Sequence, residues 1–168
     1  MALFHRRDQP PPEVVAQLPR DERVVSWANL ADGGVLLATP RGLWWPEPDG
    51  SPRLIGWQYI DKAIWRDNHV IVTEADVVDD FLLVDRPPVA VEIAVPRDLP
   101  PVIRKRVEAN VVRSEVLQVV GGAARFVARR IPGRDGVTWW ARLEGATPDV
   151  PEVRESVRAR LAALQASD

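Results

Sequence analysis

VVSWANLADGGVLLATPRGLWWPEPDGSPRLIGWQYIDKAIWRDNHVIVTEA, residues 24–75, decides the fold of this chain. Short apolar runs alternate there with turn-forming residues, and the stretch holds five of the seven tryptophans. Residues 31–34, ADGG, predict a hairpin, because Asp-Gly and Gly-Gly adopt positive φ at low cost. Residues 46–52, PEPDGSP, predict a loop, and residues 66–68 predict another turn. Short strands at this spacing favour an antiparallel barrel or sandwich over a parallel sheet.

Downstream of this stretch, the pattern predicts two short strands, a helix, a hairpin and a final helix. These elements are expected at residues 81–84, 89–95, 102–114, 123–131 with 137–144, and 150–166. Asp98 and Asp149 are the expected N-caps of the two helices. One apolar stripe along the last helix predicts that it packs onto the rest of the protein: Val150, Val153, Val157, Leu161 and Leu164.

The predicted fold class is therefore α+β: an antiparallel barrel or bent sheet capped by a helix, with a C-terminal β-hairpin and helix. We divide the chain into an N-terminal arm at 1–19, a β domain with its capping helix at 20–114, and the hairpin with the final helix at 115–168. Residues 10–12 are all proline, which favours an extended segment in the arm.

Composition excludes several classes of protein. The net charge is −2, so no global field attracts the chain to nucleic acid or anionic lipid. The absence of cysteine removes disulfides, thiolate nucleophiles and cysteine-ligated metals. No apolar run approaches the roughly 20 residues that span a bilayer, and the start, MALFHRRDQPPP, lacks the apolar region of a signal peptide. We expect a cytoplasmic protein. Arginine outnumbers lysine twenty to two, which is typical of a GC-rich genome.

No catalytic constellation is recognisable. The two histidines, His5 and His69, have no nucleophile nearby in the sequence, and the Gly-Gly pairs at 33–34 and 121–122 are expected in turns. The acidic patch Asp76, Asp79 and Asp80 lacks the spacing of a calcium loop, so a solvated loop is the expected interpretation. We predict no cofactor, no metal and no enzymatic activity. A carboxylate site in a deep pocket would be the enzymatic alternative.

Residues 104–142 contain nine arginine or lysine residues against three acids, a net charge of +6. If Ile131 opposes Val137 across the hairpin, the even positions share one face of the sheet. That face then carries Phe126, Arg130, Trp140 and Arg142. Aromatic rings interleaved with arginines suit a binding surface for protein or single-stranded nucleic acid. The alternative is that the final helix covers this face and the arginine stems lie over the rings.

Adjacent tryptophans occur twice, at Trp44-Trp45 and Trp139-Trp140. Neighbouring residues in a strand point to opposite faces, so one of each pair is expected in the core and the other outside. An exposed indole is costly unless another molecule covers it. The pairs therefore predict a protein partner or a homodimer.

The segments VLLATPRGLWW, IGWQYIDKAIW and HVIVTEA, followed by an amphipathic helix, resemble bacterial pleckstrin-homology-like or GRAM-like domains over residues 23–113. The positions that carry the resemblance are Thr39, Arg41, Leu43 to Trp45, Trp57 and Ile60. The resemblance implies binding of peptides, proteins or lipid head groups. The basic loop of phosphoinositide binders is missing, because the corresponding turn is ADGG. We therefore predict a non-catalytic interaction module that binds a protein through Trp44, Trp45, Phe126, Arg130, Trp140 and Arg142. Nucleic-acid binding through residues 104–142 is the alternative.

Overall fold

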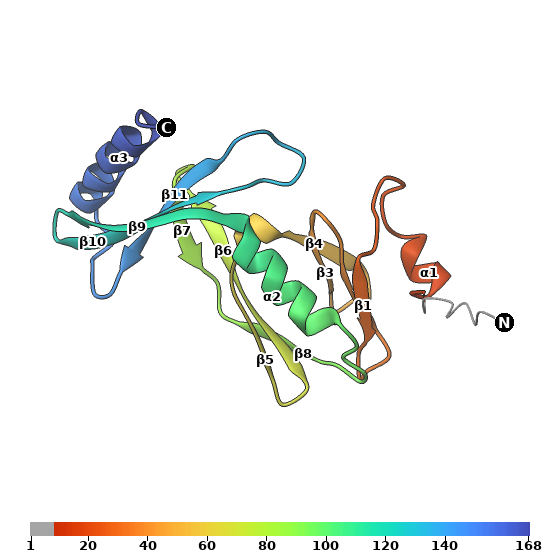
Figure 1. Cartoon of the computed structure of the whole chain (residues 1–168). Coiled ribbons are helices and arrows are strands. Elements are labelled where there is room, and N and C mark those ends of the chain that lie inside the picture. The colour runs from red at the N-terminus through yellow and green to blue at the C-terminus, as the bar shows by residue number, and fades with distance from the viewer. Residues whose placement is uncertain (1–8) are drawn as a thin grey trace.

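The computed structural model describes residues 9–168, and Figure 1 shows how their elements are arranged. The described chain has three α-helices, α1 (Pro12–Val15), α2 (Leu99–Asn110) and α3 (Pro151–Gln165), together with two β-sheets. The mixed α+β class predicted from the sequence is confirmed. No helix in the described range is long and apolar enough to cross a membrane.

The first sheet is an antiparallel meander of four strands in chain order. Its strands are β1 (Ser26–Asn29), β2 (Val35–Ala38), β3 (Gly42–Pro46) and β4 (Pro52–Gly56). The predicted turns at 31–34 and 46–52 join β1 to β2 and β3 to β4. Gly33 adopts a φ of +94°, and Asp32 Oδ1 accepts a hydrogen bond from the Gly34 amide at 3.0 Å. The turn residues thus fix the first hairpin as expected.

The second sheet begins after a 3₁₀ turn, η1 (Trp57–Tyr59). Its strands are β5 (Ile60–Arg66), β6 (His69–Val78), β7 (Leu82–Asp85), β8 (Val89–Glu92), β9 (Val111–Val119), β10 (Gly122–Arg129) and β11 (Thr138–Glu144). The order is β5-β6-β7-β11-β10-β9, and β8 pairs with β6. β6 is the longest strand, with 10 residues: its first half pairs with β5 and β8, and its second half pairs with β7. The change of partners along one strand curls the sheet.

The main hydrophobic core lies between the two sheets and is closed by α2. It includes the fully buried side chains Leu36, Leu43, Ile55, Trp57, Ile60, Val70, Val72 and Leu99. Trp57 is 2% exposed and donates its indole N–H to the Thr39 carbonyl at 2.9 Å. An isolated β-bridge also joins Leu30, next to β1, to Ile93, next to β8. Figure 1 shows α2 lying between β5 and the β1–β4 sheet.

Helix α2 ends four residues earlier than predicted, at Asn110 rather than Ser114. Asn110 is buried and donates its side-chain amide to the Arg130 carbonyl at 2.5 Å, while Arg130 donates its backbone N–H to the Asn110 carbonyl at 3.0 Å. These bonds draw the chain into β9. The predicted cap Asp98 precedes the helix but accepts from the Ser26 hydroxyl at 2.6 Å instead of capping it.

A second core lies between α3 and the β9–β10–β11 strands. Val153, Val157 and Leu161 pack against Phe81, Phe126 and Trp139, and Leu164 is partly buried beside them, so these members of the predicted apolar stripe are confirmed. Val150 precedes the helix and is 39% exposed, so its place in the stripe was wrong. The predicted cap Asp149 was wrong, because its carboxylate accepts from Arg154 at 2.5 Å and makes no capping bond.

The predicted register of the β10–β11 hairpin was wrong by one residue. Phe126 lies opposite Ala141 instead of Arg142, and Val127 lies opposite Trp140. The long connection at residues 130–137 does not fix the pairing, and burial decides it: the observed register puts Phe126 and Trp139 together beneath α3.

β11 pairs with β7 in parallel, through Ala141 and Leu82. The hairpin predicted as part of a separate unit at 115–168 therefore continues the sheet of residues 20–114. Arg129, 4% exposed, reinforces the junction: its guanidinium donates to the Ile60 carbonyl at 3.2 Å and to Asn110 Oδ1 at 3.4 Å. Burial away from water lowers the pKa of Arg129.

Candidate functional site

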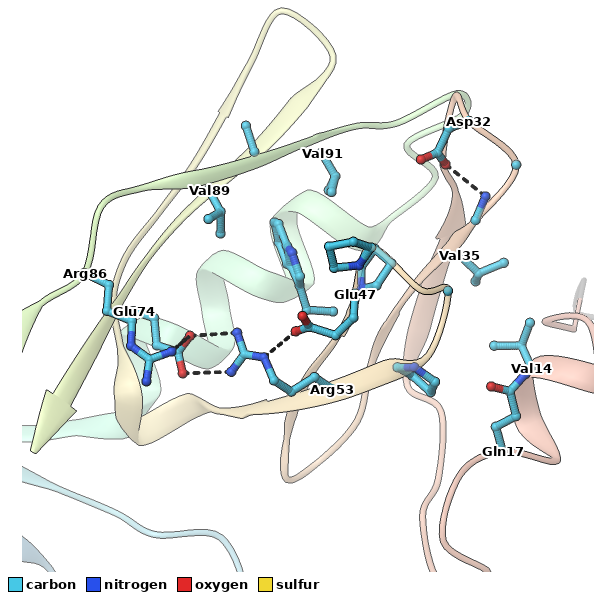
Figure 2. Close-up of a pocket in the computed structure, with 18 of the residues that line it drawn as sticks. Val14, Gln17, Asp32, Val35, Glu47, Arg53, Glu74, Arg86, Val89 and Val91 are labelled. Carbon is cyan, nitrogen blue, oxygen red and sulfur yellow. Dashed lines mark hydrogen bonds and ion pairs between the residues drawn. The ribbon is translucent and has the colours of Figure 1, made fainter.

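Several grooves open on the surface of the described residues, and one of them lies between the two sheets. It has a volume of about 870 Å³ and is lined by the β1–β2 turn, the β3–β4 hairpin, β8 and α1. Figure 2 shows Val89 and Val91 of β8 on one side and Asp32, Val35 and Val14 on the other.

A chain of alternating charges crosses this inter-sheet groove. Arg53 donates to both oxygens of Glu74, at 3.0 and 2.9 Å, and to Glu47 at 2.6 Å. Arg86 lies 3.5 Å from Glu74 and donates to Asp76 at 2.9 Å. The pair of hydrogen bonds that Arg53 donates to Glu74 raises the pKa of Arg53. Because each of these arginines is already held by two carboxylates, the chain joins the β3–β4 hairpin to β6 and β7 and offers a ligand little unsatisfied charge.

The second groove lies between β5 and α2 and has a volume of about 640 Å³. Its apolar lining includes Ala63, Ile64, Trp65, Ile103 and Val107. The four charged residues in the lining cancel in sign: Asp61, Glu108, Lys62 and Arg104. Arg104 is paired with Glu108 at 2.8 Å, and Asp61 lies 3.0 Å from Arg142. We call this concavity the β5–α2 groove.

Trp65 is the tryptophan with the largest exposure in the described chain, 39%. It faces the α2 side because of a bulge in β5. Ile60 pairs with Glu74, and the register then shifts so that Ala63 and Trp65 lie opposite the buried residues Val72 and Val70. Regular alternation from Ile60 would place Ile64 in the core, but the bulge turns Ile64 outward, where it is 37% exposed.

The free edge of β5 borders this groove. Asp67 and Asn68, with φ of 50° and 62°, form a two-residue turn between Arg66 and His69. The two residues that flank such a turn, here Arg66 and His69, exchange backbone hydrogen bonds with each other. Along a strand, the N–H and C=O groups of successive residues point alternately toward one neighbouring strand and toward the other. The N–H and C=O of Ala63 and Trp65 therefore point away from β6. Within residues 9–168, β5 has no other strand partner.

The residues predicted as a binding surface are not together. Phe126 is fully buried under α3, and Trp140 is 5% exposed on the opposite face of the sheet, with its ring 5.8 Å from Tyr59. The expectation that one tryptophan of the Trp139-Trp140 pair lies outside was wrong, because α3 covers one face and η1 with β6 covers the other.

The remaining predicted site residues are also separated. Trp45 is in the main core, and Trp44 is half-buried with its indole N–H donated to Glu22 at 3.1 Å. Arg142 is paired with Asp61 and Asp85 at 3.0 and 2.5 Å, and Arg130 is exposed.

The basic segment 104–142 is neutralised in part. Arg104, Arg113, Arg125 and Arg142 each have an acidic partner, and Arg129 is buried. Lys105, Arg106, Arg130 and Arg134 are without an ion-pair partner among residues 9–168. Nucleic-acid binding stays a prediction. It requires an affinity that falls steeply with added salt, and a filter-binding titration without retention at low salt would remove it.

The acidic patch singled out in the sequence is held in ion pairs. Asp76 pairs with Arg86, and Asp79 pairs with Arg154. No group of three potential ligands gathers among residues 9–168. Hydrogen bonds lower the pKa of Asp49, Asp76 and Asp149, which is opposite to the shift that a general acid needs. His5 lies outside the described residues, and His69 Nδ1 lies 2.7 Å from the Asp67 carbonyl.

Comparison of the chain with models of protein families, with curated proteins and with solved structures finds no match.

Proposed function

We propose that this protein is a non-catalytic interaction module that holds an extended segment of a partner protein in the β5–α2 groove. The observation that carries the proposal is the exposed Trp65 beside a free strand edge. Backbone groups on such an edge bind an added strand, and the adjoining pocket accepts its alternate side chains. Tryptophan is enriched among the residues that dominate binding energy at protein interfaces.

The chemistry of the lining indicates what the bound segment is like. The groove walls are apolar and their charges cancel, so they favour apolar side chains over a strongly charged peptide. Main-chain bonding to Ala63 and Trp65 requires an extended backbone. The expected ligand is therefore a short extended peptide with apolar residues at alternate positions.

The fold assignment belongs to the same proposal. A four-stranded meander, a second sheet and a helix that closes the core between them follow one another in residues 26–110. This order supports a pleckstrin-homology-like domain, which residues 111–168 extend with three strands and a helix. A cytoplasmic location is part of this proposal.

Trp65→Ala is expected to weaken peptide binding at least tenfold, which corresponds to about 1.4 kcal/mol or more. The peptide would be selected from a random displayed library against the native protein, and its affinity measured by isothermal titration calorimetry. The matched control is Val89→Ala, which removes a side chain of similar exposure, 43%, from the inter-sheet groove. Loss of affinity in the Val89 variant with native affinity in the Trp65 variant would contradict the proposal and place the ligand between the sheets.

A further inference from the structure

β9 is the last strand of the seven-stranded sheet, and within the described residues it pairs only with β10. It is nine residues long and contains neither lysine nor proline. A long edge strand without such residues is a template for pairing with another chain. Val112 and Val116 on this strand are each 48% exposed, so the strand also presents apolar side chains that a second chain could bury.

The backbone groups that β9 offers follow from its hairpin with β10. Val119 pairs with Gly122 across a two-residue turn, so these two residues bond to each other. Alternation then directs the N–H and C=O of Ser114, Val116 and Gln118 toward the open edge. A bulge opposite Arg129 ends the regular pairing near Val112.

We propose that β9 pairs antiparallel with β9 of a second copy of this chain, about a two-fold axis at Ser114. In this register Ser114 lies opposite Ser114, and Val116 lies opposite Val112. This surface is separate from the β5–α2 groove, so the proposal is independent of the peptide-binding function.

Charge selects this register over its neighbours. With the axis at Ser114, Arg113 of each copy lies opposite Glu115 of the other, and opposite charges across strands stabilise pairing. Two neighbouring registers also let the outward N–H and C=O groups of the two strands bond to each other. One of them places Arg113 opposite Arg113, and the other places Glu115 opposite Glu115. Within one copy, Arg113 Nη2 lies 2.5 Å from Glu115 Oε1. Two copies would therefore form a square of alternating charges.

Ser114→Cys tests the axis directly, because the native chain has no cysteine. Opposed residues that exchange both backbone bonds have Cα atoms about 5.5 Å apart, within the range that a disulfide spans. Gln118→Cys is the matched control, because it lies on the same open edge but about 26 Å from its equivalent in the second copy. Under mild oxidation of the full-length protein, a covalent dimer of the Ser114 variant is expected and none of the Gln118 variant. Crosslinking of both variants to the same extent, or of neither, would overturn the proposal.

Charge reversal tests the register. Arg113→Glu and Glu115→Arg are each expected to be monomeric, because each places like charges opposite each other. An equimolar mixture is expected to form a heterodimer, which native mass spectrometry separates by mass. Circular dichroism of each variant checks that the fold is kept. Single variants that dimerise as the native chain does, or a native chain that stays monomeric in sedimentation up to about 0.5 mM, would refute the pairing.

Discussion

Phe126→Ala is expected to lower the free energy of unfolding by about 3–5 kcal/mol, since truncation of a fully buried phenylalanine leaves a cavity that the core refills only in part. The Phe126 ring is 0% exposed and packs between α3 and the β9–β11 strands. A typical domain has a total stability of only about 5–15 kcal/mol, so the variant should unfold at a much lower urea concentration.

Val84→Ala is the control for this measurement, because Val84 is 42% exposed on the same sheet. Its truncation should lower the free energy of unfolding by no more than about 0.5 kcal/mol. A loss below about 1 kcal/mol for Phe126→Ala would mean that the ring is at the surface. The hairpin register and the position of α3 would then both be wrong.

Gly42→Ala is expected to destabilise the first sheet by about 3 kcal/mol or more, because overpacking a closed site forces the backbone to move. A Cβ at Gly42 would lie 2.1 Å from the Ile55 carbonyl oxygen and 2.9 Å from the Gly56 Cα. Gly42 pairs with Gly56 and its carbonyl accepts from the Thr39 amide at 2.9 Å. Displacement of β3 would therefore disturb the Thr39 carbonyl that holds Trp57.

Gly50→Ala is the control that distinguishes a steric clash of the added Cβ from the strain of a positive φ. Gly50 has a φ of +82° but nothing within 4 Å of the added Cβ, so only the strain of a left-handed residue, about 1–2 kcal/mol, is expected. Urea denaturation of both variants gives the comparison. Equal losses would show that the close approach of β3 and β4 does not determine stability at Gly42.

Local sequence chemistry predicted the turns of the first sheet and the buried face of the last helix, but not the helix caps or the end of α2. ADGG and PEPDGSP lie where β1–β2 and β3–β4 turn, because the residues that tolerate a turn are concentrated there. The stripe of Val153, Val157 and Leu161 likewise predicted the buried face of α3. These features depend only on residues that are close together in the sequence.

Pairing between distant strands could not be predicted in the same way. Period-2 alternation with the predicted register put Phe126 and Trp140 on one face, whereas the observed register, shifted by one residue, puts Phe126 with Trp139. It also gave no sign that both faces of β11 are covered, by α3 and by η1 with β6. The pair Trp139-Trp140 therefore suggested an exposed indole that the fold buries.

The candidate groove was missed because of a bulge. Continued alternation from Ile60 places Ile64 in the core and Trp65 outside it, whereas the shift after Ile60 puts Ala63 and Trp65 beside α2. No residue in IDKAIWR marks the bulge. The sequence does show that Ile64 and Trp65 lie close to a turn and that an amphipathic helix follows later in the chain. These two features do not determine the register of β5 against β6.

Amide hydrogen exchange at Ala63 and Trp65 tests the central claim most directly. Their N–H groups point to the open edge of β5 and should exchange rapidly in the free protein. Addition of the selected peptide should slow exchange at both, because a strand added to this edge accepts their hydrogen bonds. A saturating peptide that leaves both amides in rapid exchange would contradict the account.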